Sequence, residues 1–162
     1  MRVRHGLLIA GIAGLAFAAS AFATNIATVR YAPPKIMVID KPEAGSTEDV
    51  TVTKQGDEYS FAQPFSLTPD PKTEPGCTEN TSPDFRCPVR GIKKIVLNLR
   101  TLDDQAEIDL GSKANKVTQI LKGGEGEDTL IGGPGPQTLN GGPGVDECIG
   151  GPGQDTIRNC EE

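Results

Sequence analysis

Short stretches of alternating apolar and polar residues, separated by turn residues, follow one another through much of the chain. Residues 28–31 and 36–39 are rich in β-forming side chains and flank a pair of prolines. Residues 49–53 alternate polar and apolar positions, and a turn around Gly56 separates them from residues 59–61. Alternation with a period of two, interrupted by turn residues, predicts β-hairpins.

The strongest β-forming segment covers residues 92–99, where Ile95, Leu97 and Leu99 face the same side of an extended strand. Residues 64–88 contain several prolines and two cysteines, and we predict a loop closed by a disulfide there. No stretch after residue 23 shows a sustained helical period with capping residues. The sequence therefore predicts an all-β fold.

The first 23 residues have the pattern of a secretory signal peptide. A short basic start precedes an apolar run over residues 6–19, and Ala21-Phe22-Ala23 gives the small-x-small pattern of a cleavage site. The alternative is an uncleaved membrane anchor, but the run is shorter than the roughly 20 residues that a membrane-spanning helix needs. We predict cleavage after Ala23, a secreted or extracellular protein, and no membrane insertion of the remainder.

Composition narrows the function of the mature chain. The net charge of -6 becomes -8 after cleavage, because Arg2 and Arg4 leave and no acidic residue does. An acidic chain repels nucleic acids and anionic lipids and suits cations. His5 is the only histidine of the chain and leaves with the signal, which excludes histidine-based catalysis and zinc sites that need imidazole. We therefore expect no nucleic-acid partner and no enzyme activity.

All four cysteines follow the predicted cleavage site. An even number in an exported protein indicates disulfides, and four cysteines allow three pairings. We favour the two local pairs, Cys77–Cys87 and Cys148–Cys160. A loop the size of the first would stabilise the fold by roughly 2–3 kcal/mol on the chain-entropy model.

From Gly123 onward a nine-residue period replaces the hairpin pattern. Four consecutive units cover residues 123–131, 132–140, 141–149 and 150–158, and they follow the form G-G-x-G-x-D-x-U-x, where U is apolar, except for the sixth position of the second unit. The glycines allow a tight turn, and backbone carbonyls and a carboxylate at the sixth position are the hard oxygen ligands that calcium takes. The eighth position is expected to face the core, and its residues are Leu130, Leu139, Cys148 and Ile157.

These units resemble the RTX, or haemolysin-type, calcium-binding repeat family. The resemblance implies a right-handed parallel β-roll in which two repeats complete one coil, so that turns two repeats apart stack. It further implies that calcium lies between such turns, bound by the backbone of the second and fourth residues and by the aspartate at the sixth. On one edge these residues are Gly124, Gly126, Asp128, Gly142, Gly144 and Asp146; on the other they are Gly133, Gly135, Gly151, Gly153 and Asp155.

The second edge departs from the family pattern. Gln137 stands where the family has aspartate, and Pro136 precedes it. We therefore expect one complete site on the first edge and a weaker site, with one charge fewer, on the second. The alternatives are a flexible Gly/Pro-rich tail or a nucleotide-binding glycine loop. A tail would not repeat every nine residues with an apolar row in phase, and no G-x-G-x-x-G or GK[ST] motif is present.

The repeats need neighbours, since each coil buries its apolar face on the next. We predict hairpins over residues 24–90, degenerate coils over 91–122 (with Val117, Ile120 and Leu121 as coil residues), calcium-binding repeats over 123–158, and a cap over 159–162 in which Cys160 ties down the end. The acidic residues before the repeats form a further cation site or a solvated turn, and we favour the solvated turn; they are Asp103, Asp104, Glu107 and Asp109.

The sequence thus predicts a secreted calcium-binding protein in which ion binding and folding are coupled. One alternative is a cell-surface adhesin or coat component that calcium rigidifies, with a partner at the cell surface or in the extracellular matrix. Another is a small secreted hydrolase with the repeats as an accessory, but the chain lacks HExxH and G-x-S-x-G motifs. Typical RTX effectors have no N-terminal signal, so toxin roles are not implied.

Overall fold

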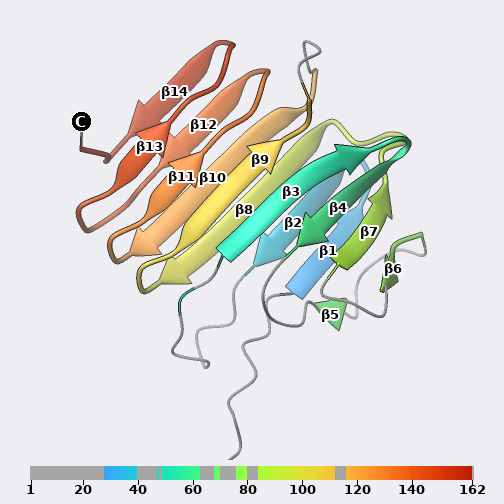
Figure 1. The fold of residues 1–162 in the computed structure, drawn as a ribbon, viewed down its shortest axis with the longest axis horizontal. Coiled ribbons are helices and arrows are strands. Elements are labelled where there is room, and N and C mark those ends of the chain that lie inside the picture. The colour runs from blue at the N-terminus through green and yellow to red at the C-terminus, as the bar shows by residue number, and fades with distance from the viewer. Residues whose placement is uncertain are drawn as a thin grey trace, which may run out of the picture.

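The structure is a computed structural model that describes residues 28–39, 47, 49–62, 68–69, 76–79, 84–111 and 116–161. Within these residues every regular element is a β-strand, which confirms the all-β prediction. The strands form two seven-stranded sheets, in the orders β14-β12-β10-β8-β2-β1-β5 and β13-β11-β9-β3-β4-β7-β6 (Figure 1). The predicted signal peptide lies outside the described residues.

The two predicted hairpins are present. β1 (Thr28–Ala32) pairs antiparallel with β2 (Lys35–Ile39), and β3 (Asp49–Gln55) pairs antiparallel with β4 (Glu58–Ala62). The first hairpin belongs to one sheet and the second to the other. Each hairpin therefore begins one of the two layers on which the rest of the chain is built.

The predicted loop over residues 64–88 is wrong at its C-terminal end. β7 (Asp84–Pro88) pairs with β4, and two short strands, β5 (Thr68–Pro69) and β6 (Thr78–Glu79), lie at the sheet edges. Phe85 and Cys87 are buried in the core. Their alternation with polar neighbours is a strand signal that the nearby prolines outweighed in the sequence.

From residue 94 the chain alternates between the two sheets. β8 (Lys94–Thr101), β10 (Thr118–Glu125), β12 (Gln137–Asn140) and β14 (Asp155–Arg158) pair in parallel in one sheet. β9 (Gln105–Asp109), β11 (Thr129–Ile131) and β13 (Glu147–Ile149) do so in the other. The chain thus advances as stacked coils, each of which contributes one strand to each sheet (Figure 1).

The coils have two lengths. Within the repeats, equivalent turn residues are separated by 18 positions, as Asp128 and Asp146 are. One coil earlier the separation is 24 positions, as between Asp104 and Asp128. The six additional residues lie between β9 and β10, because Leu97 and Ala106 are nine residues apart, as Leu121 and Leu130 are. The coil before the repeats is therefore a repeat-like coil with an insertion on one side.

The hairpins and the coils share one core. β2 pairs in parallel with β8, and β3 pairs in parallel with β9, so both sheets continue from the hairpins into the coils. A row of aliphatic side chains crosses the first sheet in register: Val38, Leu97, Leu121, Leu139 and Ile157. The first four are fully buried. This continuity gives the repeats the neighbour that a short solenoid needs.

The predicted apolar row of the repeats is buried only in part. Leu130 and Leu139 are fully buried and Cys148 packs against the core, but Ile157 is 47% exposed. Among the described residues, β14 is the edge strand of its sheet. Ile157 thus continues the core-facing row in register with Leu139, but it is not buried, because its strand lies at the edge of the described sheet.

Both predicted local disulfides are present, Cys77–Cys87 and Cys148–Cys160. They lie at opposite ends of the two sheets, the first beside β6 and β7 and the second across the last coil. In the part of the chain that the structure describes, no helix is long and apolar enough to cross a membrane.

We expect Leu121→Ala to lower the free energy of unfolding by about 2–5 kcal/mol, because it leaves a cavity between two coils. The matched control is Ile157→Ala in the same row, which should cost less than about 2 kcal/mol because nearly half of that side chain already meets solvent. Chemical denaturation in excess calcium measures both. Equal losses would contradict the placement of the core.

Candidate metal centre

The glycine-rich turns stack along two edges of the coils. On the first edge, the turn of residues 124–128 lies on the turn of residues 142–146: the Gly124 N–H donates to the Gly141 carbonyl (2.8 Å) and the Gly126 N–H to the Pro143 carbonyl (3.1 Å). On the second edge, residues 133–137 lie on residues 151–155. Repeat one therefore stacks on repeat three and repeat two on repeat four.

The close approach of the turns requires glycine. Gly142 and Gly144 have φ angles of 127° and 153°, a region that favours glycine. A Cβ at Gly142 would clash with the Gly124 carbonyl oxygen, and a Cβ at Gly144 with the Gly126 carbonyl oxygen. These two oxygens therefore lie between the stacked turns, where a bound cation would meet them.

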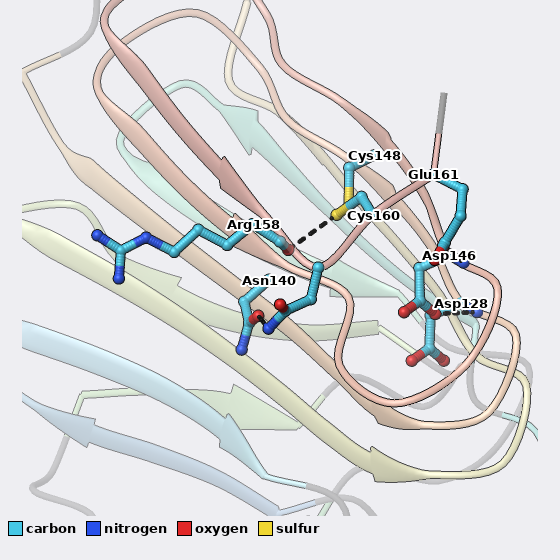
Figure 2. Close-up of a disulfide and its surroundings, with 8 residues drawn as sticks. Asp128, Asn140, Asp146, Cys148, Arg158, Cys160 and Glu161 are labelled. Atoms are coloured by element: carbon cyan, nitrogen blue, oxygen red, sulfur yellow. Dashed lines mark hydrogen bonds between the residues drawn. A yellow bond between two sulfur atoms is a disulfide. The ribbon is translucent and has the colours of Figure 1, made fainter.

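Carboxylates form a column along the first edge. The Asp128 N–H donates to Asp146 Oδ1 (2.9 Å), so the Asp146 side chain reaches back to the preceding turn. At the end of the chain, the Asp146 N–H donates to Glu161 Oε2 in the same way. Figure 2 shows these three acidic side chains following one another along the edge, close to the Cys148–Cys160 disulfide. One carboxylate of this column thus accompanies each turn.

The buried carboxylates are only partly satisfied. Asp128 and Asp146 are each 1% exposed, and the Oδ2 atom of each has no hydrogen-bond partner among the described residues. Burial raises the pKa of Asp128 to about 6; the hydrogen bond from the Asp104 N–H opposes the rise, and the charges of Asp146 and Asp103 add to it. A cation between the turns would favour the charged forms, so these residues fit a hard divalent ion.

Backbone oxygens must supply much of any site. Among the residues that the structure describes, no three histidine, cysteine, aspartate or glutamate side chains lie together in a way that could hold a metal ion. Calcium takes six to eight oxygen ligands, and carbonyls and water serve as well as carboxylates. On the first edge the Gly124 and Gly126 carbonyls and the Asp146 carboxylate come together, which is a set of this kind.

The second edge carries amides where the first carries carboxylates. Gln119, Gln137 and Asp155 stand in one register column, one residue from each successive coil. The Gly133 N–H donates to Gln119 Oε1 (3.2 Å), and Gln119 Nε2 donates to the Pro134 carbonyl (2.9 Å). Gln119 thus closes its turn by hydrogen bonds that need no ion. Asp155 is the one carboxylate of this column, and its Oδ1 is buried with no hydrogen-bond partner in the described part of the chain.

Sequence reasoning missed Gln119 and Glu161, and it favoured a solvated turn for Asp104 over a cation site. Gln119 could have been found because it lies two nonapeptides before Gln137, and Asp104 because it lies one longer coil before Asp128. Glu161 follows the last repeat and has no motif signal. The interpretation of a solvated acidic turn is wrong for Asp104, which is 3% exposed; Asp103 and Asp109 are exposed.

Comparison with known protein families agrees with this geometry. The family model of the RTX calcium-binding nonapeptide repeat matches residues 122–157 in four copies. No curated protein and no solved structure gives a significant match to the chain. The chain therefore carries RTX calcium-binding repeats at its C-terminal end, and calcium is the ion that these repeats bind.

We expect Gly144→Ala to lower both the free energy of unfolding and the calcium affinity, because its Cβ would push against the Gly126 carbonyl. Gly91→Ala is the control. Gly91 also has a positive φ of 82°, but a Cβ there would meet nothing within 4 Å, so only the backbone cost of about 1–2 kcal/mol applies. Denaturation and calorimetric titration separate the two. The same calcium affinity in both variants would argue against carbonyl ligation at this turn.

Proposed function

We propose that this is a secreted protein in which calcium, bound by the C-terminal repeats, completes the folding of the last coils. The observation that carries the proposal is the column of buried carboxylates on the first edge, in which Asp128 and Asp146 each keep one oxygen without a hydrogen-bond partner among the described residues. Repulsion between the stacked carboxylates opposes folding of the calcium-free coils. A divalent ion between them attracts both carboxylates and so favours folding.

The energy involved is modest for each site. If the dissociation constants are about 0.1–1 mM, as in extracellular calcium modules, about 1 mM calcium adds roughly 0.4–1.4 kcal/mol for each ion. Burial of apolar side chains contributes little to the last coils, since Ile149 and Ile157 are each 47% exposed. Binding free energy of this size therefore matters most in the C-terminal coils, where the fewest apolar side chains are buried.

We propose that the coils from β8 to β14 form the right-handed β-roll of the RTX family. Two features support it: the chain alternates between two sheets with parallel pairing, and each coil in the repeats has the length of two nonapeptides. The coil before the repeats would be the first coil of the roll, lengthened by its insertion.

Export is part of the same proposal. The signal-like segment before residue 24 would direct the chain out of the cytoplasm, where disulfides form and calcium is abundant. The two disulfides are consistent with such a compartment.

We further propose that the protein is not an enzyme and acts through its calcium-stabilised surface. A role as a rigid cell-surface adhesin is the alternative, and cell fractionation with and without chelator distinguishes a surface component from a freely secreted one.

Calcium removal should loosen the C-terminal coils and leave the hairpins folded. Titration of the chelator-treated protein with calcium should raise the β-sheet signal in circular dichroism and protect the residues after 118 from hydrogen exchange. Magnesium at the same concentration is the control, because it prefers a smaller octahedral site with retained water. If order and protection are equal in chelator and in calcium, the proposed coupling does not exist.

Neutralising the first edge should weaken calcium binding more than neutralising the second. Asp146→Asn keeps the shape of the side chain but removes a charge from the carboxylate column, and we expect at least a tenfold loss in affinity, roughly 1.4 kcal/mol. Asp155→Asn should have a smaller effect, because amides already occupy its column. Exposed Asp109→Asn serves as the control for net charge. Calorimetry compares the three, and an unchanged affinity in Asp146→Asn would contradict the assignment of the first edge.

A further inference from the structure

We propose a third calcium site on the first edge, between the turn of residues 100–104 and the turn of residues 124–128. The turn of residues 100–104 contains no glycine and lies outside the residues that match the repeat family. The proposal rests on the proposed function in one respect, that the repeats bind calcium at all. Its ligands would be the carbonyl oxygens of Arg100 and Leu102 and the carboxylate of Asp128.

The turn of residues 100–104 has a backbone conformation similar to that of residues 124–128. Arg100 pairs in register with Gly124, and Arg100 and Leu102 have φ angles of 85° and 77°, in the left-handed region that other residues rarely adopt. A Cβ at Gly124 would clash with the Arg100 carbonyl oxygen, and a Cβ at Gly126 with the Leu102 carbonyl oxygen. The glycine turns of repeats one and three face each other through carbonyls in the same way.

The hydrogen bonds between the turns are also repeated. The Asp104 N–H donates to Asp128 Oδ1 at 2.9 Å, as the Asp128 N–H donates to Asp146 Oδ1 at 2.9 Å. The Thr129 N–H donates to the Asp104 carbonyl at 2.8 Å, as the Glu147 N–H donates to the Asp128 carbonyl at 2.8 Å. The space between residues 100–104 and 124–128 is therefore built like the space between the two glycine turns.

The side chain of Asp128 is directed into this space. It is 1% exposed, its Oδ1 is held against the Asp104 N–H, and its Oδ2 is buried with no hydrogen-bond partner among the described residues. A second acidic side chain lies beside it: Asp103 Oδ1 accepts a hydrogen bond from the Glu127 N–H at 2.8 Å. Two carbonyls, one buried carboxylate and a neighbouring negative charge suit calcium, with water completing the shell.

A family motif does not detect this turn, for two reasons. Arg100 and Leu102 replace the glycines of the second and fourth positions, although Asp104 and Ala106 keep the sixth and eighth. The six additional residues between β9 and β10 also shift this turn out of the nine-residue period. Left-handed φ angles are unfavourable at residues other than glycine, so the surrounding structure must hold the turn in this shape.

Carbon-13 NMR of the isotope-labelled protein tests the site directly, because the carbonyl carbon of a ligating residue shifts when an ion binds. On titration with calcium, we expect the carbonyl carbons of Arg100 and Leu102 to shift together with those of Gly124 and Gly126. The carbonyl carbon of Val52, within the hairpin of β3 and β4, is the internal control and should not move. Equilibrium dialysis with radioactive calcium counts the ions on the same sample.

The control variant is Asp146→Asn, which removes a carboxylate ligand of the neighbouring site and none of the proposed ligands of the third site. It should reduce the number of bound ions by one and abolish the shifts at Gly124 and Gly126, while Arg100 and Leu102 still respond. Asp128→Asn should abolish the response at Arg100 and Leu102. If either variant fails to fold, the titration of the unaltered protein still decides the question.

The outcomes separate this inference from the proposed function. If Gly124 and Gly126 respond and Arg100 and Leu102 do not, the third site is refuted and the repeats still bind calcium. If none of the four responds and no ion is retained, the proposed function fails as well. A response at all four, with one more ion bound than in Asp146→Asn, supports the third site.

Discussion

The structure depends on how negative charge is held between stacked turns. Each coil places one carboxylate of the first edge against the backbone of the turn before it, so that Asp128, Asp146 and Glu161 succeed one another in a column. The backbone N–H groups satisfy one oxygen of each aspartate and leave the other buried. Under the proposed function, a cation between the turns replaces repulsion between these carboxylates by attraction, and burial strengthens both interactions.

The two halves of the molecule contribute unequally to stability. The hairpins supply the largest fully buried side chain, Phe61, and their strands β2 and β3 pair in parallel with the first coil. Burial then falls along the coils, from Leu121 and Leu139 to the half-exposed Ile157. The hairpins therefore give the first coil a paired and buried neighbour, whereas the last coils have the disulfide, the Glu161 contact and, under the proposed function, the ion.

The two edges of the coils carry different side chains, mainly amides on the second and carboxylates on the first. Glutamine side chains on the second edge bridge neighbouring turns by hydrogen bonds, as Gln119 does with the backbone of residues 133 and 134. An amide carries both a donor and an acceptor, so it can close a turn without an ion. Carboxylates on the first edge can only accept hydrogen bonds when ionised, and a cation would be their missing partner. Under the proposed function, the turn that Gln119 closes is held without an ion, whereas the first edge depends on calcium.

The sequence by itself determined the local features: the hairpins, the nine-residue repeat, the glycine turns, and disulfides between cysteines that lie close along the chain. These follow from short-range periodicity and backbone preference, which a single sequence carries. Only the tertiary structure decided which turns lie together. The burial of Asp104, the column of Gln119, the exposure of Ile157 and the placement of Glu161 all depend on register between coils of two different lengths. Register is set by how the two sheets pack around a common core. Because one coil contains an insertion, a fixed nine-residue period does not predict the register across that coil.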